Sequence, residues 1–180
     1  IRFSTKDLPE SQFLYGEQAP EPLLVTENGV QFATYLNEGL MTGIFLDQKE
    51  VRGRLVDGFA VGKTVLNMFS YTGAFSVAAA MGGAVATTSV DLAKRSLPKT
   101  TEQFEVNHLN LAAQKIIVMD VFDYFKYASR KGLSYDMIIL DPPSFARNKK
   151  KVFSVAKNYG ELVKDSIDIL TDKGTLIAST

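Results

Sequence analysis

The sequence has 180 residues, of which 46% are hydrophobic and 22% are charged, which fits one principal domain with a sizeable core. Its formal net charge is zero, so an overall attraction to nucleic acid is excluded and any such affinity must come from a local patch. There is no cysteine, which excludes disulfides, thiolate metal sites and cysteine nucleophiles within these residues, and fits a cytoplasmic protein without a metal.

The first predicted element is a β-hairpin. Residues 23–27 and 30–36 are strand-like, and they flank Asn28 and Gly29, a pair that favours a tight two-residue turn.

The segment after the hairpin predicts a short strand and then a helix. Residues 44–46 are apolar and read as the strand. Asp47 is placed to cap a helix that runs to about Val56, and Gly58 is placed to end it.

From Thr64 onward, apolar runs alternate with helical patterns. The predicted strands are residues 64–69, 84–90, 115–119, 135–140 and 175–179. The predicted helices are a small-residue helix within 70–83, then 93–107, 121–132 and 154–170. Pro98 should kink the second of these helices or shift its start, and Lys173-Gly174 should form a turn.

This alternation predicts an α/β fold with a doubly wound, mainly parallel sheet and helices on both faces. We expect residues 1–46 to form an N-terminal hairpin extension and residues 47–180 to form the main domain. Residues 64–90 lack charge, but polar residues and glycines interrupt them, so a buried sheet interior is expected there and not a membrane span. No signal peptide is visible.

Three carboxylates directly follow predicted strands. They are Asp91, Asp120 and Asp141, and the carboxyl ends of parallel strands form the usual ligand edge of such sheets. Asp91 lies 18 residues after Gly73, a spacing typical of a carboxylate that binds ribose hydroxyls. Any one of them is as readily a helix cap. The turn before Gly73 lacks the pattern G-x-G-x-x-G, so it suits a nucleoside without a diphosphate better than a dinucleotide.

Together these motifs resemble class I S-adenosylmethionine-dependent methyltransferases, which have a Rossmann-like fold. LNMFSYTGAFSVAAAMGGA, TTSVDLAKRSL and LDPPSFARNK resemble the bacterial family that makes 5-methylcytosine or 7-methylguanine in 23S ribosomal RNA, and TGIFLDQKEVR resembles the segment before its catalytic core. The sheet of such enzymes has seven strands. The main domain is therefore expected to be truncated after its fifth strand, and that exposed strand is a site where copies could associate as a homodimer.

The resemblance implies a set of residues around the cofactor, S-adenosylmethionine. Those at its methionine end are Phe45, Asp47, Gln48, Arg52, Asn67, Phe69, Ser70, Tyr71, Thr72 and Gly73. Those at its ribose and adenine are Asp91, Leu92, Asp120, Val121 and Phe122. The apolar members could equally be core residues, and Arg52 a cation on a helix face.

The resemblance also implies a catalytic edge and an RNA contact. Asp141, Pro142 and Pro143 would face the methyl group and the incoming base, and Phe145 would stack on that base. The cations that follow could contact phosphate or form a solvated loop: Arg147, Lys149, Lys150 and Lys151.

The type of base follows from the missing cysteine. Cytosine C5 becomes nucleophilic only after a cysteine adds to C6, whereas guanine N7 has a free lone pair. The 5-methylcytosine members carry that cysteine at or just after the fifth strand, where this chain has Ser179 and Thr180. A nitrogen acceptor in 23S ribosomal RNA, of the guanine N7 type, is therefore favoured, and the alternative is a nucleophile beyond residue 180. A nicotinamide-dependent oxidoreductase and a non-catalytic RNA-binding fragment remain alternatives.

Overall fold

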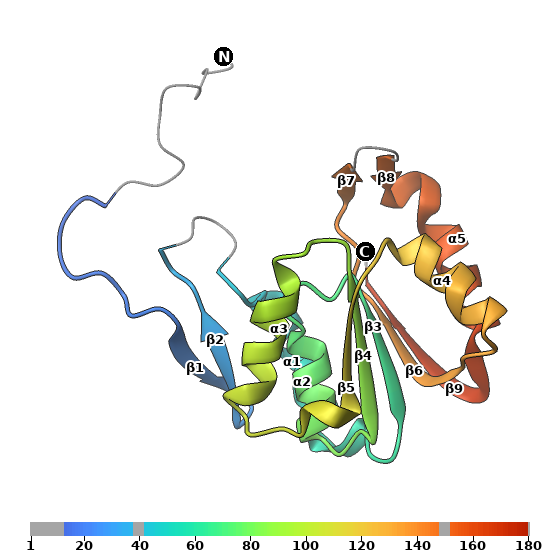
Figure 1. Cartoon of the computed structure of the whole chain (residues 1–180), viewed down its shortest axis with the longest axis horizontal. Coiled ribbons are helices and arrows are strands. Elements are labelled where there is room, and N and C mark those ends of the chain that lie inside the picture. Colours follow the sequence, from blue (N-terminus) through green and yellow to red (C-terminus); the bar gives the residue numbers. More distant parts are fainter. Residues whose placement is uncertain (1–12, 38–41, 148–151, 180) are drawn as a thin grey trace.

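The computed structural model describes residues 13–37, 42–147 and 152–179. Its centre is a five-stranded parallel sheet in the order β5-β4-β3-β6-β9 (Figure 1). The strands are β3 (Thr64–Met68), β4 (Ala86–Asp91), β5 (Gln114–Val118), β6 (Tyr135–Leu140) and β9 (Leu170–Ala178). The α/β class and the five strands predicted from the sequence are confirmed.

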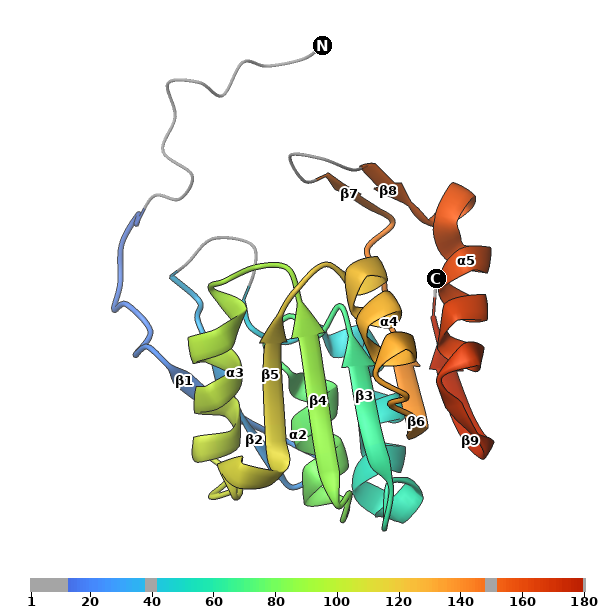
Figure 2. The ribbon, with the colours of Figure 1, turned by 45° about the vertical axis from the view of Figure 1, so that its right-hand side comes forward.

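Helices cover both faces of this sheet (Figure 2). One face carries α1 (Lys49–Arg54), α2 (Ala74–Met81) and α3 (Ser96–Glu105), and the other carries α4 (Val121–Arg130) and α5 (Val155–Asp168). The chain therefore winds in both directions from the middle of the sheet, as predicted for a doubly wound fold.

The central strands are apolar on both sides because each face has its own core. Leu66 and Ile138 pack with Leu162 of α5 on one face. Val65 and Ile139 pack with residues of α2 on the other face. Successive residues of a strand point to opposite faces, so a strand buried on both sides reads as a continuous apolar run.

The N-terminal hairpin is formed by β1 (Leu23–Glu27) and β2 (Val30–Thr34). Its residues Val30 and Phe32 share a core with Val77 of α2 and Phe104 of α3. The side-chain amide of Gln103 accepts from the N–H of Ala33 at 2.9 Å and donates to its carbonyl at 2.7 Å. The hairpin thus packs on the helices of the main domain, and the division at residue 46 stays a prediction.

The segment after the hairpin differs from its prediction. Residues 44–46 form no strand. Leu46–Gln48 is instead the 3-10 helix η1, which α1 and the wider turn η2 (Leu55–Phe59) continue. The N-cap of α1 is Gln48, and Asp47 lies inside η1, so Asp47 is not the cap of that helix. A three-residue apolar run is too short to distinguish a strand from the wall of a turn. Gly58 has a φ of 101° and breaks the helix, as predicted.

Four smaller features complete the fold. Pro98 lies in the first turn of α3, so it shifts the start of the helix to Ser96. Residues Lys173 and Gly174 lie within β9, at a change of register against β6, and do not form a separate turn. The segment predicted as a cationic loop contains an antiparallel ribbon, β7 (Phe145–Arg147) and β8 (Val152–Ser154). Before β5 lies a short 3-10 helix, η3 (Leu111–Ala113).

Candidate functional site

A cavity of about 1010 Å³ opens at the carboxyl ends of the sheet strands. Asp91, Asp120 and Asp141 all line it. The expectation that these carboxylates converge on one edge of the sheet is therefore confirmed.

The floor of the cavity includes a strained loop between β3 and α2. Phe69 and Tyr71 have φ values of 58° and 52°, in the left-handed region that side chains other than glycine rarely adopt. The N–H of Ser70 donates to the carbonyl of Val90 at 3.0 Å, and the N–H of Tyr71 donates to Asp91 Oδ2 at 2.9 Å. These hydrogen bonds stabilise backbone conformations that are otherwise unfavourable for Phe69 and Tyr71. Strained backbone of this kind is common where a loop lines a ligand site.

Gly73 ends this loop and begins α2. Its φ is 79°, and a Cβ there would lie 2.5 Å from Cγ2 of Thr100. Glycine is therefore required by backbone conformation and by the close approach of α3. Gly73 does not itself line the cavity, so its contribution to the site is the shape of the loop.

Two of the carboxylates also hold the backbone around them. Asp91 Oδ1 accepts from the N–H of Ala93 at 2.8 Å. Asp120 is the N-cap of α4 and accepts from the N–H of Phe122 at 3.1 Å. The capping role is thus real for Asp120, but a carboxylate oxygen can accept more than one hydrogen bond, so capping does not exclude a ligand.

The segment before η1 forms a second wall and is tied to the strained loop. The N–H of Gly43 donates to the hydroxyl of Tyr71 at 3.0 Å, and the hydroxyl of Thr72 donates to the carbonyl of Gly43 at 2.5 Å. The rings of Phe45 and Tyr71 are 5.4 Å apart. This wall and the floor therefore form one connected unit.

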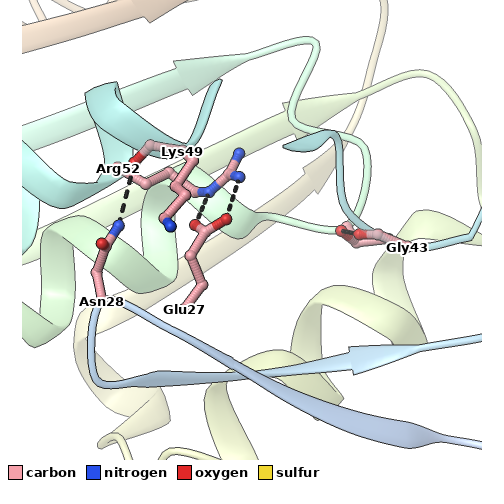
Figure 3. A network of polar contacts seen from close by, with 6 residues as sticks. Glu27, Asn28, Gly43, Lys49 and Arg52 are labelled. Carbon is pink, nitrogen blue, oxygen red and sulfur yellow. Dashed lines mark hydrogen bonds and ion pairs between the residues drawn. The ribbon is translucent and has the colours of Figure 1, made fainter. Parts of the chain in front are cut away.

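Arg52 lines the cavity, but its guanidinium group is held from behind by Glu27 of the hairpin (Figure 3). Nε lies 2.7 Å from Oε1, and Nη2 lies 2.9 Å from Oε2. The guanidinium carbon is 5.9 Å from the ring centres of both Phe32 and Phe75. The side chains of the pair are only 2% and 7% exposed, so this is a buried ion pair and not a cation on a helix face.

Asp141 begins the wall on the other side of the cavity. It follows β6 directly, and Pro142, Pro143 and Ser144 continue the wall. The hydroxyl of Ser179, just after β9, donates to Asp141 Oδ1. Gln48 Nε2 lies 3.4 Å from the same oxygen. The two walls therefore meet at Asp141.

Phe145 and Phe153 lie on opposite faces of the β7–β8 ribbon. Phe145 pairs with Ser154, and Phe153 pairs with Ala146, so the two rings alternate across the ribbon. Phe153 is buried, lines the cavity and packs against Phe69 and Phe122, with ring centres 5.5 and 6.2 Å away. Phe145 is 61% exposed and does not line the cavity.

Most of the predicted cofactor and catalytic residues line this one cavity. They are Phe45, Asp47, Gln48, Arg52, Phe69, Ser70, Tyr71, Thr72, Asp91, Leu92, Asp120, Val121, Phe122, Asp141, Pro142 and Pro143. Asn67, Gly73 and Phe145 are not among its lining residues. Asn67 is fully buried and donates to the hydroxyl of Ser76 at 3.0 Å. Lys149, Lys150 and Lys151 lie outside the described residues, and only the backbone of Arg147 is described.

Several lining residues were not predicted from the sequence. Those on the side of α4 and α5 are Lys126, Phe153, Asn158 and Glu161. No local motif marks them, because the packing of α5 against α4 brings them to the cavity. For Ser179, the resemblance indicates only that it stands in the place of a cysteine.

Two further properties concern the described ranges, residues 13–37, 42–147 and 152–179. Within them, no cluster of His, Asp or Glu side chains is arranged to hold a metal ion. Among the described helices, none is long and apolar enough to cross a membrane.

Comparisons with known proteins agree with this geometry. The profile of a family described as S-adenosylmethionine-dependent methyltransferases matches residues 5–180. The chain is 59% identical over 181 residues to YwbD of Bacillus subtilis (strain 168), a provisionally assigned ribosomal RNA large subunit methyltransferase. It is 36% identical over 173 residues to a ribosomal RNA large subunit methyltransferase of Deinococcus radiodurans. These matches cover 99% and 96% of this chain but only 46% and 42% of the relatives, so the chain spans about half of their length.

A solved structure shows the same fold. SMU.776, a provisionally assigned methyltransferase complexed with SAH, superposes with a TM-score of 0.89 and 62% identity, over 92% of this chain and 43% of that one. The Rossmann-like fold and the cofactor inferred from the sequence motifs are thereby confirmed, and the nicotinamide alternative finds no support. The chain belongs to the S-adenosylmethionine-dependent methyltransferase family.

Proposed function

We propose that this chain is the cofactor-binding and catalytic part of a methyltransferase that modifies a base of 23S ribosomal RNA. The relatives named above are described as ribosomal RNA large subunit methyltransferases, provisionally for YwbD, and the similar solved structure holds SAH. When bound, S-adenosylmethionine supplies an activated methyl group, so the protein contributes mainly orientation and electrostatics.

We assign the nucleoside half of this cofactor to residues on one side of the cavity. Asp91 is the acceptor for the ribose hydroxyls, and Asp120 is the acceptor for the adenine amino group. Leu92 is 49% exposed although it is a large apolar side chain at a cavity wall, so a flat ring can bury it. Val121 and Phe122 provide the neighbouring surface.

The methionine half is assigned to the connected unit of the floor loop and the wall before η1. Its residues are Phe45, Asp47, Gln48, Arg52, Phe69, Ser70, Tyr71 and Thr72, with Asn67 and Gly73 acting through the shape of the loop. Phe45 is 50% exposed at the cavity, which again leaves apolar surface for a ligand to cover.

The acceptor base is assigned to the edge formed by Asp141, Pro142 and Pro143. The single observation that carries this proposal is that Asp141 and Asp91 line the same cavity, which puts a reacting edge and a ribose-binding carboxylate in one space. The two prolines restrict the backbone there, and in-line displacement tolerates little misalignment. Outside this edge we assign RNA contacts to Phe145, Arg147, Lys149, Lys150 and Lys151.

A nitrogen acceptor of the guanine N7 type is favoured over cytosine C5. These 180 residues contain no cysteine, and the resemblance places Ser179 where 5-methylcytosine enzymes carry their nucleophile. Guanine N7 needs no covalent activation, because its lone pair is free.

The test uses the intact protein in which this chain occurs. Calorimetry should show S-adenosylmethionine binding and no comparable binding of NAD, and Asp91→Asn should weaken the former about tenfold or more, as expected for lost bonds to a charged acceptor. Transfer of labelled methyl to 23S ribosomal RNA, naked or in the large subunit, should be lost in Asp141→Ala.

Mass spectrometry of the product should place the methyl group on a nitrogen atom. A product labelled at cytosine C5 would refute the choice of acceptor. Full transfer by Asp141→Ala would remove that residue from the mechanism, and absence of transfer to any RNA would favour a non-catalytic RNA-binding protein.

A further inference from the structure

Ser179 is bound to β6 by its backbone and to Asp141 by its side chain. Its N–H donates to the carbonyl of Leu140 at 3.0 Å, which continues the pairing of β9 with β6 by one residue. Its hydroxyl oxygen lies 2.5 Å from Asp141 Oδ1 and 3.3 Å from the carbonyl of Leu140. A hydroxyl has one proton to donate, and the shorter distance and the charge assign it to the carboxylate.

The two donors near Asp141 approach the same oxygen. Gln48 Nε2, from the opposite wall, is 3.4 Å from Oδ1, a longer and weaker contact than that of Ser179. Among the side chains that the structure describes, none donates to Oδ2. Both Ser179 and Gln48 line the cavity, so this arrangement lies at the site and not behind it.

We propose that Ser179 is a positioning residue, which fixes the rotation of the Asp141 carboxylate so that Oδ2 faces the acceptor base and accepts from one of its N–H groups. The proposal rests on the function proposed above. The terminal torsion of aspartate is broad, so without a donor at Oδ1 the carboxylate would sample other rotations. A base held by a rotating acceptor spends less time aligned for displacement.

This role differs from the one that the same position has in the 5-methylcytosine enzymes that the sequence resembles. There the side chain is a nucleophile. Here the hydroxyl proton is engaged by Asp141, and the serine acts on the base only through that carboxylate. A thiol is a weak donor, so cysteine at this position would hold Asp141 less well.

The test compares Ser179→Ala, Ser179→Cys and Ser179→Thr in the intact protein, with S-adenosylmethionine and 23S ribosomal RNA as substrates. Alanine and cysteine should lower kcat about tenfold, the effect of one charge-assisted hydrogen bond, with the KM for S-adenosylmethionine within about twofold of wild type. Threonine keeps the hydroxyl and should restore most of the rate. Ser129→Ala, an exposed serine on α4 outside the cavity lining, is the matched control and should change neither constant.

A double-mutant cycle separates positioning from a general structural role. In an Asp141→Asn background, Ser179→Ala should change the residual single-turnover rate less than about twofold, because its effect passes through the carboxylate. An unchanged kcat in Ser179→Ala, failure of threonine to rescue, or additive losses in the double variant would each overturn the proposal. The proposed function would fail differently, through full activity of Asp141→Ala or absence of methyl transfer by the wild type.

Discussion

At the scale of single residues, Arg52 shows how a side chain can serve the fold and the site together. It is 2% exposed, it forms a two-point ion pair with Glu27, and its guanidinium group lies near two phenylalanine rings. The pair joins the hairpin to α1 (Figure 3), and Arg52 is also one of the residues that line the cavity. The position of the hairpin is therefore linked to the wall assigned to the methionine half of the cofactor.

Removing one partner of this ion pair should destabilise the fold. Arg52→Met leaves a buried, unpaired Glu27, and the free energy of unfolding should fall by about 3–5 kcal/mol. The double variant Glu27→Leu/Arg52→Met should recover much of the loss, because no charge stays buried. Urea denaturation measures both values. A loss below about 1 kcal/mol, the range of exposed pairs, would contradict the buried ion pair.

At the scale of elements, strands were predicted from sequence better than the segments between them. The apolar run 137–140 within β6 is typical of a strand in a sheet that is covered on both faces, and its length and its place between helical patterns favour a strand over a helix. The three-residue run 44–46 carries no such constraint, and only its last residue, Leu46, belongs to η1.

The site residues also divide into those that the sequence predicts and those that it does not. Asp91, Asp120 and Asp141 could be found because the chemistry of a parallel sheet places ligands at strand ends. The left-handed conformations of Phe69 and Tyr71 could not be found, since residues of these types are rare there and contacts with β4 impose them. Phe153 was missed because its partners Phe69 and Phe122 are distant in sequence.

The β7–β8 ribbon gives its two phenylalanines separate tasks that can be tested. Phe153→Leu removes ring contacts at the cavity wall and should weaken S-adenosylmethionine binding several-fold, as expected for the loss of about 1 kcal/mol. Phe145→Leu changes the exposed face, so it should leave that affinity unchanged and raise the KM for RNA. Calorimetry and methyl-transfer kinetics on the two variants measure this. Equal effects of both variants on cofactor affinity would show that the two rings share one face.

At the scale of the whole molecule, hydrogen bonds to one carboxylate connect three sheet strands at the end of the sheet opposite the cavity. Asp136 of β6 accepts from the N–H and the hydroxyl of Thr64 at the start of β3, at 2.9 and 2.8 Å. It also accepts from the hydroxyl of Thr171 of β9 at 3.2 Å. The bonds from Thr64 lower the pKa of Asp136 below its usual value, against a smaller opposing effect of burial.

The pKa of a second carboxyl group is shifted in the opposite direction. Burial raises the pKa of Asp165 on α5, and the nearby charges of Glu161 and Asp168 raise it further. A group with a raised pKa disfavours folding while it is ionised, and this cost disappears on acidification. Asp165 therefore makes the protein relatively more stable as the pH falls, and Asp136 makes it less stable.

The directions of these two pKa shifts predict how the stability of the fold changes on acidification. The stabilisation from Asp136 is present above the unfolded value of 3.8 and is lost as the pH falls through the lower pKa of the folded state. Urea denaturation at about pH 6 and about pH 3 should show that Asp136→Asn loses less stability on acidification than wild type. Asp165→Asn, the matched control on another element, should lose more, because it lacks the compensating gain. If Asp136→Asn lost as much free energy of unfolding on acidification as wild type, the hydrogen bonds of Asp136 across β3, β6 and β9 would not be the cause of the acid sensitivity.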